Sequence, residues 1–327
     1  MAHEQFVVIT GPEDEQLGHV PFVAEHMAGA DLLVVDPVPA TLSGKGLSYR
    51  VQDEVQCVYD DVLLDRVAAV WDRRPTTLDR HMLEPVHPSC RRYAWSAIQE
   101  HTRQFYAQFR DALWVSDHHA VQRAENKVLQ LAEATKIGFN VPETIITSDP
   151  DAARQFVTNR HAAIVKGLGG ETPIIGNTWL LMFSTKVTPD TELDYDNLRY
   201  APAIFQQAID PEHDLRITVV EDEVFPASVI SDAEATETTG VRDWRIGNHL
   251  GNLSITECVL PDDVKDKCIQ HVRRLGLRFG AIDMIRDKKG TYWFIENNPN
   301  GQWAFIEEAT RQPIGRAIAR LLLSGRG

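Results

Sequence analysis

One segment of this chain, residues 292–303 (YWFIENNPNGQW), limits the possible folds more than any other. Its apolar first half delivers Glu296 and Asn298, and side chains two residues apart leave the same face of a β-strand. A second apolar run, FGAIDMI, carries Asp283 and leads into the turn-like sequence IRDKKGT. Pairing the two runs as antiparallel strands would bring the three side chains together. The sequence therefore predicts a β-hairpin with a polar cluster on one face of a sheet.

The residue types in this cluster indicate a magnesium site. An Asp, Glu and Asn set offers only oxygen ligands, without a nearby Cys or His, and Mg²⁺ combines such ligands with waters and substrate phosphates. That combination points to nucleotide chemistry. The competing interpretation is an ordinary turn after a strand, because Asn, Pro and Gly in ENNPNG are common turn residues. Further motifs have to decide between the two.

The composition is that of an ordinary globular protein with excess negative charge. The 327 residues suffice for two or three subdomains, and 43% of them are apolar. With 33 Lys and Arg against 47 Asp and Glu, the formal charge of −14 disfavours nonspecific binding to nucleic acid or an anionic membrane. A bound nucleotide would need local positive charge against this background.

Targeting and redox signals favour a cytoplasmic location. No apolar stretch approaches the roughly 20 residues of a membrane-spanning helix, and acids follow the short apolar run at the amino terminus, so we expect no signal peptide. The cysteines lie far apart without CxxC spacing, which fits neither a disulfide framework nor zinc. They are Cys57, Cys90, Cys258 and Cys268.

The first third of the chain has an α/β rhythm. Apolar runs at 6–10, 31–36 and 67–71 alternate with helix or loop sequence, which is typical of a small parallel sheet. Residues 90–113 carry apolar side chains near helical spacing and predict one long amphipathic helix. The sequence SDHH then suggests a domain boundary near residue 116.

The remaining chain alternates between helices and strands. One helix is expected from 120 to Gly138, and a second over 149–159, where Ser148 or Asp149 supplies the cap. We predict strands after Pro142 and at 162–166, 203–209, 215–220 and 224–230, a hairpin over 174–187, a mobile loop over 231–248 and a final helix from Pro313.

Two lysines stand where they could meet an anion. Lys166 closes the apolar strand directly before GLGG, whose glycines let backbone amides approach phosphate oxygens. A lysine in that position loses solvation unless an anion meets it. Lys127 lies in a predicted helix, where a solvated surface lysine is the competing interpretation.

Taken in order, several motifs resemble those of the ATP-grasp ligases, and the ordered set is far more specific than any one motif. They are NKxxxLxxA at 126–134, VKGLGG at 165–170, FQQAI at 205–209, DLRITVV at 214–220, DWR at 243–245, AID ending at Asp283, and IENNPNG at 295–301. The resemblance covers about residues 117–327. It implies an α/β (α+β) ATP-grasp fold with an N-terminal pre-ATP-grasp α/β domain at 1–116, a central lid domain at 117–205 and a C-terminal catalytic domain at 206–327.

The same resemblance implies which residues bind ATP. Lys127 and Lys166 would hold its phosphates, and Asp214 would lie near the ribose or the phosphates. Adenine would meet the backbone of a hinge formed by Gln207, Ala208 and Ile209. Many ATP-grasp ligases have Glu where Gln207 stands, which leaves the role of that side chain open.

The resemblance also implies a metal set and two arginines at the reacting groups. Mg²⁺ would be bound by Asp283, Glu296 and Asn298. Arg245 would contact the nucleotide or the reacting carboxylate, whereas Arg216 would steady the carboxylate or simply pair with a neighbouring acid such as Asp214. We find neither a GxSxG motif nor a supported Cys–His set, and phosphoryl transfer requires no protein nucleophile.

Within the superfamily, the chain is most similar to the graspetide synthetases, the microviridin-type maturases of ribosomal peptides. The similar segments are VWDRRP at 70–75, NVPETIITSDP at 140–150 and residues 296–314. The likeness implies that Asp or Glu side chains of a precursor peptide (leader plus core) become acyl phosphates, which Ser, Thr or Lys side chains attack to form ω-esters or ω-amides. VWDRRP also fits a strand followed by a basic turn.

Two other functions stay open at this point. One is an ATP-grasp ligase for free amino acids or for the C-terminal tail of a protein, and the other is a nucleotide-binding regulatory protein without turnover. The expected partner is the precursor peptide, with no nucleic acid and no membrane. The precursor, the choice between ester and amide, and the presence of a homodimer are not determined by the sequence.

Overall fold

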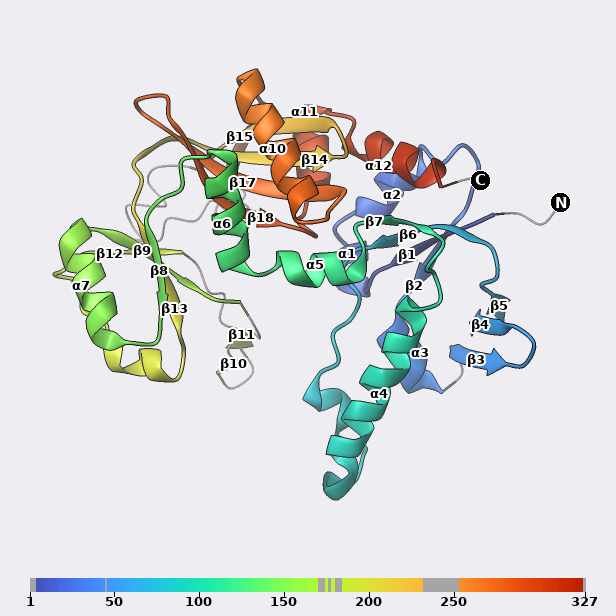
Figure 1. Cartoon of the computed structure of the whole chain (residues 1–327). Coiled ribbons are helices and arrows are strands. Elements are labelled where there is room, and N and C mark those ends of the chain that lie inside the picture. Colours follow the sequence, from blue (N-terminus) through green and yellow to red (C-terminus); the bar gives the residue numbers. More distant parts are fainter. Residues whose placement is uncertain are drawn as a thin grey trace.

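A computed structural model describes residues 4–44, 46–169, 174–175, 178–179, 184–231 and 253–325. They form a parallel sheet at the amino end, a separate small antiparallel sheet in the centre and a five-stranded antiparallel sheet towards the carboxyl end. Figure 1 shows the first two on opposite sides of the third. The predicted mobile loop at 231–248 lies outside the described residues, apart from its first position.

The amino-terminal sheet is parallel, with the strand order β2-β1-β6-β7. The three predicted strands are confirmed as β1 (Gln5–Ile9), β2 (Leu32–Val35) and β6 (Val67–Asp72). Around them lie α1 (Pro12–Glu15), α2 (His19–Ala24), α3 (Pro37–Ser43), the 3₁₀ turns η1 (Arg80–Leu83) and η2 (Pro88–Cys90), and α4 (Arg91–Tyr106).

Two details of this region were predicted wrongly or not at all. The expected helix over 90–113 ends at Tyr106, because the apolar run at β7 (Leu113–Val115) pairs with β6 as the edge strand. A small antiparallel sheet of β3 (Leu47–Val51), β4 (Val55–Tyr59) and β5 (Val62–Leu63) was missed. Its strands are mostly exposed, so the apolar alternation that marks a strand in sequence is weak.

The helix expected from residue 120 to Gly138 is two helices, α5 (His118–Ala124) and α6 (Lys127–Ile137). Asn126 separates them and caps α6, because its side-chain oxygen accepts a hydrogen bond from the Leu129 amide at 3.0 Å. Gly138 ends α6 in the left-handed conformation, as predicted. Lys127 is therefore the first residue of a helix rather than an interior one.

The central antiparallel sheet has the order β12-β9-β13-β8 and its own apolar core with α7. The helix predicted over 149–159 is confirmed as α7 (Pro150–Arg160), capped by Asp149. The hairpin expected over 174–187 is only partly present, because β10 and β11 pair with each other whereas β12 pairs with β9. The other elements are β8 (Thr144–Thr147), β9 (Ala163–Gly167), β10 (Ile174–Ile175), β11 (Thr178–Trp179), β12 (Thr185–Val187), η3 (Tyr195–Arg199) and β13 (Ala203–Gln207).

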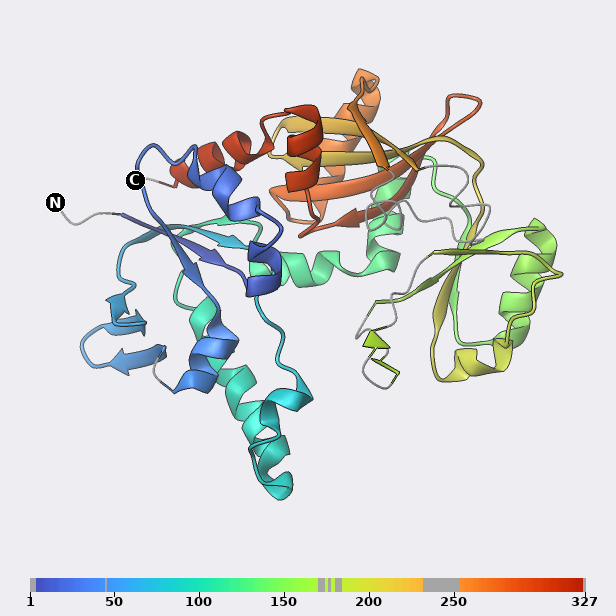
Figure 2. The same cartoon turned by 180° about the vertical axis from the view of Figure 1, so that it is seen from behind.

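The five-stranded sheet has the order β16-β15-β14-β17-β18. The hairpin predicted from the metal-site motif is confirmed, since β17 and β18 pair antiparallel with Asp283 opposite Glu296. The strands are β14 (Pro211–Val220), β15 (Glu223–Ser231), β16 (Leu253–Glu257), β17 (Phe279–Asp287) and β18 (Tyr292–Asn298), and the helices α10 (Asp262–Arg274), α11 (Ala304–Thr310) and α12 (Ile314–Leu323) accompany them. Figure 2 shows α12 leaving this sheet towards the amino-terminal one.

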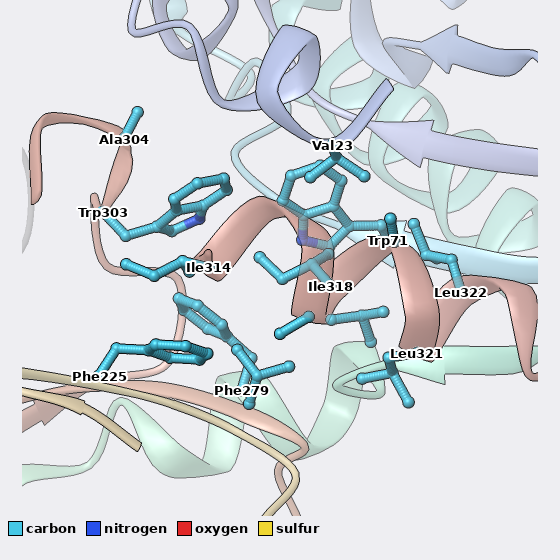
Figure 3. Packing of buried hydrophobic residues seen from close by; sticks show 14 of the residues in the cluster. Val23, Trp71, Phe225, Phe279, Trp303, Ala304, Ile314, Ile318, Leu321 and Leu322 are labelled. Atoms are coloured by element: carbon cyan, nitrogen blue, oxygen red, sulfur yellow. The ribbon is translucent and has the colours of Figure 1, made fainter. Parts of the chain in front are cut away.

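One apolar core joins the first and last parts of the chain. Trp71 of β6 lies in the same buried cluster as Trp303 and as Ile318 of α12 (Figure 3). A second cluster packs α5 and α6 on the five-stranded sheet, although both helices fall within the predicted central segment 117–205. The domain boundaries at 116 and 205 stay predictions. No helix in the described ranges has the length and apolarity that crossing a membrane requires.

Candidate active site

The three predicted metal ligands lie together on β17 and β18. Asn298 Nδ2 is 3.1 Å from Asp283 Oδ2 and 3.5 Å from Glu296 Oε1. Gly301 permits the chain to turn back closely here, because a Cβ at that position would lie 2.4 Å from the Ala281 Cβ. Among the described residues no group of three or more His, Cys, Asp or Glu side chains could hold a metal, so a metal site here needs the Asn298 amide oxygen. Two carboxylates and an amide are a donor set that fits Mg²⁺.

Two cations contact these carboxylates. Lys127 Nζ is 2.8 Å from Glu296 Oε2, and Arg216 Nη1 is 2.8 Å from Asp283 Oδ1. Arg216 thus pairs with Asp283, which lies directly opposite it on the neighbouring strand β17. Asn126 caps α6, so Lys127 is the first residue of that helix. From there its side chain reaches the edge strand β18. The arrangement places positive charge beside the expected metal site, as phosphate binding requires.

A pocket of about 90 Å³ lies between the central sheet and the five-stranded sheet. It brings together candidates from distant parts of the sequence. Those that line it are Lys166, Gln207, Ile209, Asp214, Asp283 and Glu296. Ala208 sits between two lining residues but is not among them, and Lys127 reaches the site through Glu296. Arg245 lies outside the described residues.

The sequence analysis missed Gln206, which also lines this pocket. Lys166 Nζ donates to Gln206 Oε1 at 3.1 Å, and Gln206 Nε2 donates to Thr144 Oγ1 at 3.1 Å. The strand register explains the contact, because Lys166 pairs with Ile204 and the residue two further on shares its face. Alternation of side chains along the two strands would have identified Gln206 as a neighbour of Lys166. Gln206 therefore fixes the direction of the lysine.

The VWDRRP segment, whose role the sequence left open, contacts the loop that follows the metal ligands. Arg73 is buried, with Nη2 2.8 Å from Asp14 Oδ1 and Nη1 donating to the Gly301 carbonyl at 3.2 Å. Burial works to raise the pKa of Asp14, but the charge and hydrogen bonds of Arg73 outweigh it and lower that pKa. Arg74 donates to the Asn300 carbonyl at 3.0 Å. The amino-terminal part of the chain thus supports the loop after the metal ligands.

A model of the RimK-like ATP-grasp domain matches residues 124–322. The chain belongs to the RimK-like ATP-grasp family. The match extends from the end of α5 to α12 and confirms the predicted ATP-grasp fold.

Solved structures agree over the whole chain. A RiPP-associated ATP-grasp ligase of Chryseobacterium gregarium, in complex with ADP and a leader and core peptide, has a TM-score of 0.85 at 25% identity, covering 99% of this chain and 98% of that one. The macrocyclase MdnC of Microcystis aeruginosa MRC, bound with precursor peptide MdnA, has a TM-score of 0.77 at 23% identity, covering 98% and 100%. The predicted likeness to graspetide synthetases is confirmed.

Curated proteins give weaker matches. The chain is 23% identical over 196 residues to the alpha-aminoadipate–LysW ligase LysX of Sulfurisphaera tokodaii, which is 57% of this chain and 62% of LysX. It is also 23% identical over 267 residues to a probable alpha-L-glutamate ligase of Xanthomonas euvesicatoria, covering 79% and 82%. The first match thus spans less than two thirds of that relative.

Proposed function

We propose that this protein is an ATP-dependent peptide ligase of graspetide biosynthesis. It activates Asp or Glu side chains of a ribosomal precursor peptide as acyl phosphates and joins them to Ser, Thr or Lys side chains as ω-esters or ω-amides. The observation that carries the proposal is the match along 99% of the chain to a ligase that holds ADP, a leader and a core peptide. ATP and Mg²⁺ are the proposed cofactors, with reaction in the cytoplasm.

The site residues divide into three tasks. ATP is held by Lys127, Lys166, Asp214 and the backbone of residues 207–209. The metal ligands are Asp283, Glu296 and Asn298. When bound there, Mg²⁺ supplies charge stabilisation for the transferring phosphoryl group. Arg216 and Arg245 steady the peptide carboxylate.

The reaction balances without a protein nucleophile. A carboxylate oxygen of the peptide attacks the γ-phosphorus of ATP, and the bond from that phosphorus to ADP breaks. The hydroxyl or amine of the acceptor side chain then attacks the acyl carbon, phosphate leaves, and the acceptor proton is released to solvent. Each closed ring therefore removes one water from the peptide.

Mass spectrometry of a candidate precursor incubated with ATP tests the proposal. We expect loss of one water per ring and ADP release that depends on the precursor. Hydroxylamine added during turnover should intercept the acyl phosphate as a hydroxamate on a peptide Asp or Glu, most abundantly when the acceptor residue is replaced by Ala. Hydroxamate on the enzyme would exclude this mechanism, and ring formation without any hydroxamate would count against an accessible acyl phosphate.

The curated matches favour one alternative, a ligase that adds amino acids such as glutamate to a substrate or a protein tail. That enzyme would release ADP with free amino acids and increase the mass of its substrate, whereas ring closure decreases it. A regulatory protein without turnover would release no ADP with either substrate. The homodimer stays a prediction, to be tested by light scattering.

A further inference from the structure

A chain of three hydrogen bonds crosses one face of the central sheet and ends at Lys166. Lys166 Nζ donates to Gln206 Oε1 at 3.1 Å, and Gln206 Nε2 donates to Thr144 Oγ1 at 3.1 Å. The Thr144 hydroxyl in turn donates to the Pro142 carbonyl at 2.8 Å. The three strands that carry these side chains, β9, β13 and β8, are neighbours in the sheet (Figure 1). Side chains thus connect a candidate phosphate ligand to the backbone just before β8.

Each bond in this chain has only one possible direction. The Pro142 carbonyl can only accept, so the Thr144 hydroxyl gives its single proton to it. The Thr144 oxygen is then an acceptor towards Gln206, which has to present its NH₂ group. The carbonyl oxygen of the Gln206 amide consequently faces Lys166, whose ammonium group can only donate. The orientation of the amide is therefore fixed at both ends.

This chain lies between the nucleotide pocket and the rest of the sheet. Lys166 and Gln206 line the pocket, whereas the described residues that line it do not include Thr144. The opposite face of the sheet carries Phe205 and packs in the apolar core with α7. Gln206 is only 4% exposed, so its amide depends on protein partners for its hydrogen bonds. The route from Thr144 to the pocket runs through that amide.

The residue that holds the lysine is neutral, and the charge of the pocket explains why this matters. Asp214, Asp283 and Glu296 already bring carboxylates to the lining. A carboxylate at position 206 would add a further negative charge, which would attract the Lys166 ammonium and repel a phosphate. An amide oxygen fixes the direction of the ammonium without that repulsion.

We propose that Thr144 is a positioning residue for nucleotide binding, because its hydroxyl orients the Gln206 amide and the amide directs Lys166 at the phosphates. This inference rests on the proposed function, in which Lys166 holds the ATP phosphates. Without the hydroxyl, Gln206 Nε2 loses its acceptor, and nothing keeps the amide oxygen towards the lysine. A turned amide would present its NH₂ group to the ammonium, and two donors repel each other. Thr144 thus influences phosphate binding from outside the pocket.

The first experiment replaces Thr144 with valine, which keeps the branched shape but lacks the hydroxyl. Calorimetric titration of the whole protein with Mg²⁺·ADP should show an affinity about tenfold lower for Thr144→Val, because a buried donor is left without a partner. Thr144→Ser keeps the hydroxyl and should bind like the wild type. Equal affinity of Thr144→Val and the wild type would overturn the proposal.

Strand β8 supplies a matched control in Thr147. It is also partly buried, and its hydroxyl oxygen accepts a hydrogen bond from the Asp149 amide at 2.9 Å, but it is not among the lining residues of the pocket. Thr147→Val should therefore bind Mg²⁺·ADP with the affinity of the wild type. A loss as large as that of Thr144→Val would mean that any such change in β8 weakens binding, and would overturn the proposal.

A double-mutant cycle separates positioning from a general disturbance of the sheet. Gln206→Leu removes the connection, so Thr144→Val added to it should change the Mg²⁺·ADP affinity by less than about twofold. A second loss of about tenfold in that background would mean that Thr144 acts by another route, and would overturn the proposal. Thermal unfolding checks that each variant is folded.

Both measurements need no precursor peptide, so the two proposals can fail separately. A wild-type protein that binds Mg²⁺·ADP but dehydrates no precursor would refute the proposed function, and the cycle would still decide the role of Thr144. If Lys166→Ala binds Mg²⁺·ADP as tightly as the wild type, Lys166 does not hold the phosphates and the positioning role of Thr144 is refuted.

Discussion

Lys166 on β9 and Glu296 on β18 line the same pocket from two different sheets. We predict that Lys166→Ala and Glu296→Ala each abolish ATP turnover, since loss of one charge-stabilising contact can slow a reaction by about 10²–10³-fold. Both residues are only partly buried, so the variants should stay folded. Precursor-dependent ADP release measures the effect. Lys186→Ala, at an exposed position on the neighbouring strand β12, is the control and should keep its activity. Near-normal release by either site variant would refute that assignment.

His19 is a buried histidine whose two ring nitrogens have no hydrogen-bond partner among the described residues. Burial, together with the charge of Arg73, lowers the pKa of His19 from 6.5 to about 3. The unfolded chain therefore takes up a proton below pH 6.5 that the folded chain does not. The folded state therefore has its full stability with respect to His19 above pH 6.5. The free energy of unfolding then decreases as the pH falls towards about 3.

We accordingly predict that His19→Phe reduces the loss of stability between pH 6.5 and pH 4, by an amount on the order of a few kcal/mol. Phe can keep the contact with Trp303, whose ring centroid is 5.0 Å from that of His19. Urea unfolding followed by tryptophan fluorescence at several pH values measures this. His87→Phe, at an exposed position, should leave the slope unchanged. An unaltered slope in His19→Phe would mean that other groups, such as buried His271, dominate the acid limb.

At this scale the sequence predicted some side chains and not others. Glu296 and Asn298 could be predicted because strand periodicity relates them, and Asp283 could be predicted because the expected hairpin pairs its strand with theirs. Asp14, Arg73 and Arg74 were not, because their partners lie more than two hundred residues away or in another element, and no local pattern records such contacts.

Helix α6 is attached to the edge strand β18 by one buried side chain. Gln130 Nε2 donates to Asn297 O at 2.7 Å, and Gln130 Oε1 accepts from Asn297 N at 3.0 Å. The amide thus pairs with β18 as another strand would, between the two metal ligands Glu296 and Asn298. By holding α6 against β18, Gln130 also fixes how far Lys127 lies from Glu296.

We predict that Gln130→Ala destabilises the protein by about 2–3 kcal/mol, because it removes a partner from three backbone groups, the Ala124 carbonyl and the Asn297 amide and carbonyl. It should also weaken Mg²⁺·ATP binding, since Lys127 loses its fixed position. Chemical denaturation and calorimetric titration measure the two effects. Gln104→Ala, on the exposed face of α4, should change stability by less than about 0.5 kcal/mol. An equal effect of both substitutions would contradict this role of Gln130.

Elements with a strong apolar pattern and clear caps were predictable, and weakly patterned ones were not. Asp149 and Gly138 marked real helix ends. Asn126 lay inside an apparently continuous helical pattern, so its capping role was missed and α5 and α6 were merged. The three exposed strands β3, β4 and β5 carry no periodic signal strong enough to reveal a sheet.

At the scale of the whole molecule, α12 approaches α2 closely at Gly315. A Cβ at this position would lie 2.8 Å from the Phe22 carbonyl oxygen. We predict that Gly315→Ala lowers the free energy of unfolding by about 1–3 kcal/mol, because backbone has to shift. Thermal unfolding measures it, with exposed Arg316→Ala on the same helix as control. A stabilised Gly315→Ala protein would show that the two helices separate at little cost.

The shared core of β6, Trp303 and α12 also has a temporal consequence. The strands β1 and β6 leave the ribosome long before α12, so they receive Ile314, Ile318 and Leu322 only after all of the segment between β6 and α12 has been synthesised. Until then Trp71 and Val23 have no complete apolar surroundings, and nascent chains in that state are prone to aggregate. Slow translation of the segment between β6 and α12 would therefore lengthen the time during which this apolar surface is exposed, and yield in cells would depend on chaperones that cover the amino-terminal sheet until α12 is available.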